Sequence, residues 1–245
     1  MKIGVFSDVH SNLEALNACL NRLQKEQVEA YIYCGDLIGY GPDPEECVQR
    51  ILALPLKGCV MGNHDAVFVE PGLAAFFNYD AQIALEKTKS LLSEASIQAL
   101  RRLPQRVQGD DFCVVHGTPF DPVKEYFSSC LQFRFNYNLW KGQICFVGHT
   151  HLTFFMEGGE NNCTVFLVPE QDRTISLKPQ SRYIINPGSV GKPRDNNAQA
   201  SFGVWDTQAH TFRFLREPYD VKTTQEKMRR YKFPGFLIDS LSIGL

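Results

Sequence analysis

Acidic and imidazole side chains recur in this sequence directly after short apolar runs. Five of the six histidines lie in such positions, next to aspartate, asparagine or glycine. The segments concerned are residues 7–10, 35–36, 62–65, 115–117 and 148–151. The sixth histidine, His210, falls in a predicted turn without such neighbours. Carboxylate, amide and imidazole groups in this setting are suited to binding metal ions and to acid–base chemistry.

The donor types indicate which metals such a site would take. Imidazole and carboxylate ligands suit Mn, Fe, Zn or Ni, and the absence of cysteine from the pattern disfavours a structural zinc site. One histidine after a strand is more often a structural polar residue than a ligand. Five such endings in one chain favour a shared metal site, provided that the strands end at one sheet edge.

The elements that must position these residues can be read from hydrophobic periodicity. Residues 2–7, 29–34 and 58–61 are apolar strand runs, separated by helical patterns that begin near Ser11 and at Pro44. We expect Ser11 to cap the first helix, with Glu14 completing a capping box. The alternation predicts parallel strands joined by right-handed crossovers.

The rest of the chain changes character twice. Two amphipathic helices are expected at residues 81–92 and 96–103, and strands resume at 112–115 and 144–147. After residue 152, short runs separated by turn residues predict antiparallel strands. These lie at residues 165–168, 174–178, 183–185, 202–205 and 211–215, and a short helix is expected at 224–231.

Composition excludes several classes of protein. The 245 residues carry a net charge of −2, so no basic excess suggests a nucleic-acid partner, and no apolar run approaches the ~20 residues of a membrane span. The N-terminus lacks the features of a secretory signal. The 8 cysteines contain no Cys-x-x-Cys pair, and we interpret them as reduced core thiols of a cytoplasmic protein.

The full motif set resembles a known family. Asp8-x-His10, Gly35-Asp36, Gly62-Asn63-His64-Asp65, His116 and Gly148-His149-x-His151 together resemble the calcineurin-like metallophosphoesterase superfamily, most closely its small bacterial phosphoesterase branch. Residues 11–16, 39–44 and 186–191 agree with the same family. The resemblance covers roughly residues 1–206, and the combination of motifs is far more specific than its fragments.

The resemblance implies a fold and a set of roles. The fold would be an α/β four-layer αββα sandwich, with two mixed sheets flanked by helices. Two divalent metal ions would be bound, the first by Asp8, His10, Asp36 and His151, and the second by Asp36, Asn63, His116 and His149. A hydroxide bridging the ions would attack phosphorus in line, and His64 would protonate the leaving group as general acid.

One departure from the family narrows the activity. The protein-phosphatase branch continues its second motif with an aspartate and then Arg-Gly, whereas residues 35–41 here contain neither. We therefore expect phosphodiester or nucleotide substrates rather than phosphoproteins. Asp65 is the candidate to orient His64, although a structural role is equally compatible. The alternatives are a phosphomonoesterase or protein phosphatase, and a non-catalytic, metal-stabilised scaffold of the same fold.

The remaining expectations concern domains, substrate contacts and partners. We expect a metallophosphoesterase domain over residues 1–217, with a helical insert at 66–106 that overhangs the site, and a C-terminal tail over 218–245. The candidate substrate contacts are Asn12, Ser189 and Arg194. The expected partner is a small phosphoester substrate, with no nucleic acid or membrane, while a homo-oligomer is possible.

Overall fold

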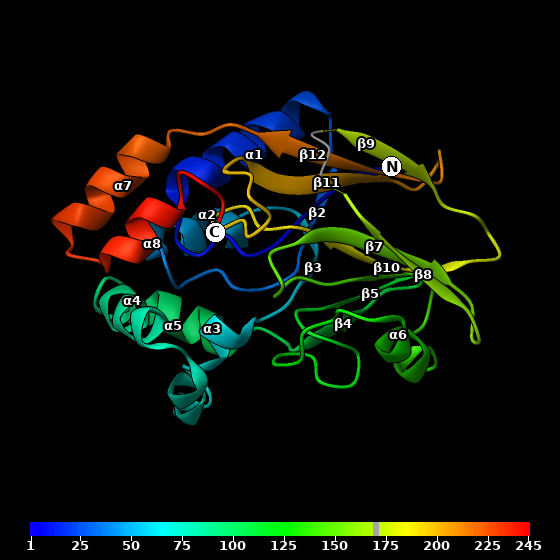
Figure 1. The fold of residues 1–245 in the computed structure, drawn as a ribbon, viewed down its shortest axis with the longest axis horizontal. Coiled ribbons are helices and arrows are strands. Elements are labelled where there is room, and N and C mark those ends of the chain that lie inside the picture. The colour runs from blue at the N-terminus through cyan, green and yellow to red at the C-terminus, as the bar shows by residue number, and fades with distance from the viewer. Residues whose placement is uncertain (169–171) are drawn as a thin grey trace.

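The computed structural model describes residues 1–168 and 172–245, which form two mixed six-stranded sheets with helices outside them (Figure 1). In the first sheet β1, β2 and β3 pair in parallel, as the alternating pattern predicts, and the other strands are antiparallel. Its spatial order is β3 (Leu56–Cys59), β2 (Ala30–Tyr33), β1 (Lys2–Phe6), β11 (Ala200–Asp206), β12 (Thr211–Glu217) and β9 (Arg173–Ser176).

The second sheet is built from the middle of the chain. Strands β5, β6 and β10 are parallel, and the remaining pairs are antiparallel. Its spatial order is β4 (Arg106–Gln108), β5 (Phe112–Val115), β6 (Ile144–Phe146), β10 (Arg182–Pro187), β7 (Thr153–Gly158) and β8 (Cys163–Leu167). Both sheets therefore combine a parallel half, whose strands end together, with an antiparallel half.

The layers are held together by three apolar clusters. Between the sheets, Val5 and Ile32 of the first pack in one buried cluster with Phe146 and Ile185 of the second. Helices α1 (Leu13–Lys25) and α2 (Pro44–Leu52) cover the outer face of the first sheet, and α6 (Cys130–Asn136) covers the second. The expected αββα sandwich is thus confirmed.

The start of α1 differs from the prediction. Asn12 is the N-cap, and its side-chain oxygen accepts a hydrogen bond from Ala15 N at 3.1 Å. Ser11 lies one residue earlier, with a φ of 58° and a hydroxyl without a partner. Asparagine caps as well as serine does, and the left-handed backbone at Ser11 removes it from the capping position.

The insert and the tail form one packed unit. α3 (Asn63–Ala66) leads into the insert, which contains the 3-10 helix η1 (Pro71–Phe76), α4 (Tyr79–Ser90) and α5 (Glu94–Arg101). The tail contains α7 (Val221–Arg230) and α8 (Gly235–Ser240), which lies beside α4 in Figure 1. Ala81 and Ala84 of α4 share a buried cluster with Met228 of α7 and Leu237 of α8. Packing of the tail against the insert thus fixes the position of α4.

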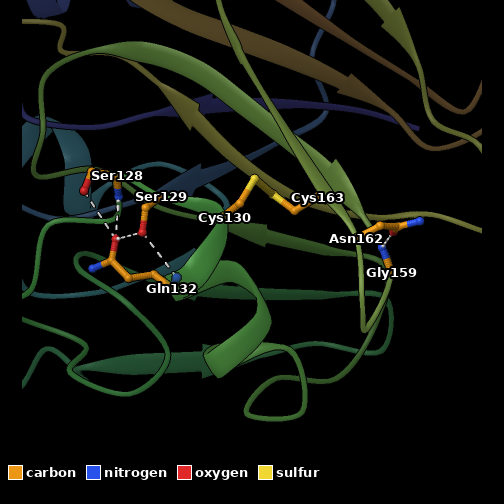
Figure 2. The surroundings of a disulfide bond; sticks show 7 residues. All are labelled: Ser128, Ser129, Cys130, Gln132, Gly159, Asn162 and Cys163. Carbon is orange, nitrogen blue, oxygen red and sulfur yellow. Dashed lines mark hydrogen bonds between the residues drawn. A yellow bond between two sulfur atoms is a disulfide. The ribbon is translucent and has the colours of Figure 1, made fainter.

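The prediction that all cysteines are reduced is wrong for one pair. A disulfide joins Cys130, the first residue of α6, to Cys163, the first residue of β8 (Figure 2). The two lie 33 residues apart in sequence, so no local spacing indicated the pairing. The other cysteines, Cys19, Cys34, Cys47, Cys59, Cys113 and Cys145, are free thiols. Within the described parts of the chain, no helix has the length and apolar character needed to cross a membrane.

Candidate metal centre

The predicted ligands all follow strands of the parallel halves of the sheets. Asp8 and His10 follow β1, Asp36 follows β2, and Asn63 begins α3 after β3. His116 directly follows β5, while His149 and His151 follow β6. The carboxyl ends of these strands lie at one edge, so residues from position 8 to 151 meet there.

The backbone at this edge is unusual for residues with side chains. Left-handed φ angles of 48° to 68° occur at five predicted ligands, which are Asp8, His10, Asp36, His149 and His151. Such conformations cost roughly 1–3 kcal/mol each and persist only where the surroundings enforce them. Their concentration at one edge of the sandwich is typical of a functional site.

Two glycines allow the ligand loops to approach closely. A Cβ atom at Gly62 would collide with Asp36 Oδ1, and one at Gly148 would collide with Ser7 Oγ. Any residue other than glycine at either position would therefore push a ligand loop out of place.

The first group of donors contains Asp8, His10, Asp36 and His151, all buried. The Nε2 atoms of His10 and His151 lie 3.0 Å apart. Asp8 Oδ1 is 3.4 Å from His151 Nε2, and Asp36 Oδ2 is 3.5 Å from His10 Nε2. Four ligand atoms therefore surround one small volume, in the combination that the family resemblance assigned to the first ion.

The second group contains Asp36, His116 and His149. His116 Nε2 lies 3.1 Å from His149 Nδ1 and 3.3 Å from Asp36 Oδ2. Asn63 Oδ1 is 3.1 Å from the same His116 nitrogen, which adds the predicted amide donor. Asp36 thus lies in both groups and is placed to bridge them.

The hydrogen bonds of the imidazole rings show that these donors suit cations. Each ring binds a backbone carbonyl with its other nitrogen: His10 Nδ1 with Ile38 O, His116 Nδ1 with Cys34 O, His149 Nε2 with Lys124 O, and His151 Nδ1 with Lys192 O. Since those nitrogens donate N–H, the opposite nitrogen of each neutral ring presents a lone pair to its neighbours, and that of His116 does so once the ring gives up its second proton. Such a set of acceptors fits metal ions, and carbonyl partners of this kind fix ligand rings in place.

The pKa shifts show how charge is distributed over the carboxylates and imidazoles of the cluster itself. Burial raises the pKa of Asp8 to about 7. Burial disfavours a charged His116, but Asp36 and Asp8 raise its pKa to about 9. Burial opposes ionisation of Asp36 as well, yet His116 and His64 keep its pKa well below the usual value. The cluster therefore retains positive charge between its carboxylates.

His64 lies beside this cluster and has a different environment. Its backbone N–H donates to Asp36 Oδ1 at 2.9 Å, and its ring stacks on Phe77 with centroids 4.4 Å apart. His64 Nδ1 is buried without a hydrogen-bond partner. Burial lowers the pKa of the ring to about 4. The imidazole is neutral at pH 7 and is not among the metal-donor groups.

Asp65, the candidate to orient His64, forms no hydrogen bond with His64 Nδ1, and its contacts fit the structural alternative. Asp65 instead accepts hydrogen bonds from four backbone N–H groups, at distances of 2.9 to 3.2 Å; they belong to Asp36, Leu37, Ile38 and Gly62. Burial and the Asp36 carboxylate raise the pKa of Asp65 to about 7, while these amides lower it. Asp65 therefore positions the loop that carries Asp36.

The three predicted substrate contacts lie in different places. Asn12 is buried, caps α1 and also donates to Gly191 O at 3.0 Å. The Ser189 hydroxyl is buried and donates to Asp8 O at 2.8 Å, which braces a ligand loop. Arg194 lines the cavity above the cluster, and its guanidinium donates to the Tyr40 hydroxyl at 3.2 Å. Of the three, Arg194 is the one that lines the cavity.

A cavity of about 920 Å³ opens over the donor groups. Asp36, Asn63, His64, His149 and His151 line its floor, together with the cationic residues Lys124, Lys192 and Arg194. The insert and the tail contribute most of the remaining lining. The volume of the cavity suits a small-molecule ligand.

Sequence reasoning missed several residues that shape this site. Tyr126 stacks on His149 with centroids 4.0 Å apart, and the Lys124 carbonyl binds the same ring at 3.0 Å. Lys192 is buried, and its Nζ donates to Ser240 Oγ at 2.9 Å. The tail reaches the cavity through Phe236, Leu237 and Leu245. No pattern in the sequence indicates the backbone carbonyl contacts or a tail that folds back over the site.

Comparison with known proteins agrees with this geometry. Residues 1–210 match the family described as the calcineurin-like phosphoesterase superfamily domain. The chain belongs to this family, as its motifs suggested.

Similarity to individual proteins extends over the whole chain. The uncharacterized protein MJ0912 of Methanocaldococcus jannaschii is 34% identical over 248 residues, covering 99% of this chain and 98% of its own. A metallophosphoesterase from Sphaerobacter thermophilus is 34% identical, with a TM-score of 0.88 over 100% of this chain and 99% of its own. The hypothetical protein PH1004 of Pyrococcus horikoshii OT3 shares the fold, with a TM-score of 0.78, 18% identity and coverage of 100% and 98%.

Proposed function

We propose that this protein is a cytoplasmic phosphoesterase that binds two divalent metal ions and hydrolyses small phosphoesters, with phosphodiesters or nucleotides preferred. One observation carries the proposal: two groups of buried donors share Asp36, and their lone pairs converge at the base of a cavity. Two ions bound there would neutralise phosphoryl oxygens and lower the pKa of water near them.

The chain's own residues complete the proposed chemistry. Arg194 and Lys124 place positive charge along the cavity, where phosphate oxygens of a substrate would lie. His64 is proposed to protonate the leaving oxygen. Since burial lowers the pKa of the free ring to about 4, the anionic substrate must raise that pKa before His64 can carry the proton.

Two features support a small substrate over a phosphoprotein. The insert and the tail both line the cavity, whose volume of about 920 Å³ lies in the range of small-molecule sites. The segment after Asp36 also lacks the Asp and Arg-Gly of the protein-phosphatase branch.

The test is a hydrolysis panel with metal supplied. A methyl aryl diester, an aryl monoester, a nucleotide and a phosphopeptide are assayed with Mn²⁺, Fe²⁺, Zn²⁺ or Ni²⁺ added to chelator-treated protein. We expect diester or nucleotide turnover that needs added metal. Asp36→Asn should reduce the number of bound ions and abolish turnover, whereas the exposed Asp110→Asn should match the wild type. Metal binding without hydrolysis of any phosphoester would favour the scaffold alternative.

A further inference from the structure

Two chemically different sets of residues line the cavity over the metal donors, and each set is called a side of the cavity. One side carries the donors and the cationic residues Lys124, Lys192 and Arg194. The other is apolar and is formed by Leu73, Phe76, Phe77 and Ala81 of the insert, and by Phe236 and Leu237 of the tail. A phosphate group alone would use only the first side.

Two phenyl rings on the apolar side are left uncovered by the protein. Phe76 is 85% exposed and Phe236 is 63% exposed, although both line the cavity. Each is held by a buried neighbour, since Leu73 and Leu237 are only 4% and 3% exposed. Leu73 and Phe76 are three residues apart in the 3-10 helix η1, so they share its cavity-facing side. The protein thus anchors each segment and leaves the ring available.

The apolar side is continuous with the proposed proton donor. Phe77 stacks on the His64 ring at an interplanar angle of 26°, and His64 also lines the cavity. The group that leaves with a proton from His64 would therefore lie next to Phe77, in the cavity that the two uncovered rings also line. Exposed phenyl rings that line a cavity favour a planar aromatic group, because ring pairs gain stabilisation beyond their buried area.

Packing between the insert and the tail holds the two rings at one cavity. Ala81 of α4 and Leu237 of α8 both line the cavity and belong to the same buried cluster, and the two helices lie side by side in Figure 1. The apolar side is therefore a built surface composed of two segments about 160 residues apart in the sequence.

We propose that Phe76 and Phe236 form a subsite for a planar aromatic group carried by the phosphoester, such as an aryl ring or a nucleobase. This inference rests on the proposed function and names the class of substrate that the site prefers. It makes both phenylalanines specificity-determining residues without a part in bond breaking.

Binding of phosphonates tests the subsite independently of turnover. Dissociation constants of phenyl-, cyclohexyl- and methylphosphonate are measured by calorimetry on the full-length protein with Mn²⁺. We expect the wild type to prefer phenyl- to methylphosphonate, and each of Phe76→Ala and Phe236→Ala to lower this preference about five- to tenfold. Phe135 of α6 is 63% exposed and does not line the cavity, so Phe135→Ala is the matched control and should keep the full preference.

Three results would overturn the subsite. They are equal binding of phenyl- and methylphosphonate by the wild type, equal binding of phenyl- and cyclohexylphosphonate, and full phenyl preference in both alanine variants. A dimer in sedimentation that the double variant converts to monomers would also overturn it, because a second copy would then cover the rings. If aryl preference is found but no phosphoester is hydrolysed, the proposed function fails and the subsite stands. Hydrolysis without aryl preference leaves the function and removes the subsite.

Discussion

The Asp65 carboxylate does not contact the adjacent His64 ring but binds the backbone that carries Asp36. Its Oδ2 atom accepts from Asp36 N at 2.9 Å and from Gly62 N at 3.0 Å. Two ligand loops, those after β2 and β3, are thus joined by one buried carboxylate. Asp65 therefore acts on the metal donors through the position of Asp36 rather than through the His64 ring.

This relationship predicts the outcome of Asp65→Asn. The amide would turn an NH₂ group toward backbone N–H donors, which cannot accept it, so we expect stability to fall by roughly 3 kcal/mol. Affinity for Mn²⁺ should fall as well, because the Asp36 loop loses its anchor. Urea denaturation and metal titration measure the two effects. A variant that binds metal normally and loses only kcat would instead indicate that Asp65 orients His64.

His64→Ala, unlike Asp65→Asn, should reduce turnover without weakening metal binding. The imidazole is not part of either donor group, so both should still bind metal with near wild-type affinity. We expect kcat to fall about 10²- to 10⁴-fold for esters with poor leaving groups, which need a proton, and less for p-nitrophenolate. The exposed His210→Ala serves as control in the same assays. Equal losses for good and poor leaving groups would show that His64 does not donate the proton.

The metal donors could be predicted from sequence because each follows a strand of the parallel half of a sheet. Chain order then places Asp8, Asp36 and His116 at one edge without knowledge of distances. The role of Asp65 could not be predicted, because it depends on backbone amides, which every residue has. Phe76 and Phe236 meet at one cavity only through packing of the tail on the insert. The Cys130–Cys163 bridge likewise joins two segments that only the folded chain brings together.

Lys192 provides a prediction on pH and stability. Burial, aided by Arg194, lowers the pKa of Lys192 to about 8. Because the folded-state pKa lies below that of the unfolded chain, the charged form is disfavoured in the folded protein. The unfolded state therefore binds more protons than the folded state between about pH 8 and 10.5. The contribution of Lys192 to the free energy of unfolding rises with pH across that window.

We expect Lys192→Met to remove this dependence. At pH 7 the free energy of unfolding of the variant should rise by up to roughly 3 kcal/mol, because the buried charge is absent. Loss of the hydrogen bond from Nζ to Ser240 Oγ offsets part of this gain. The stability difference between variant and wild type should shrink as pH rises from 8 to 10. Urea denaturation at four pH values measures it, with the exposed Lys141→Met as control. A difference that stays constant with pH would show that Lys192 does not titrate in this range.

The disulfide predicts a thiol count and a loss of stability on reduction. Unfolded without reductant, the chain should show 6 reactive thiols, and 8 after reduction. The bridge closes a loop over a sequence separation of 33 residues, so its loss should cost about 4 kcal/mol by the chain-entropy model. Cys163→Ser should reproduce this loss, and its stability should be insensitive to dithiothreitol, while Cys59→Ser keeps the wild-type response.

The bridge also anchors the end of segment 117–129, in which Tyr126 and Lys124 hold the His149 ring. We therefore expect loss of the bridge to decrease metal affinity modestly. Eight reactive thiols in the unreduced, unfolded protein would contradict the bridge and restore the expectation of a fully reduced chain.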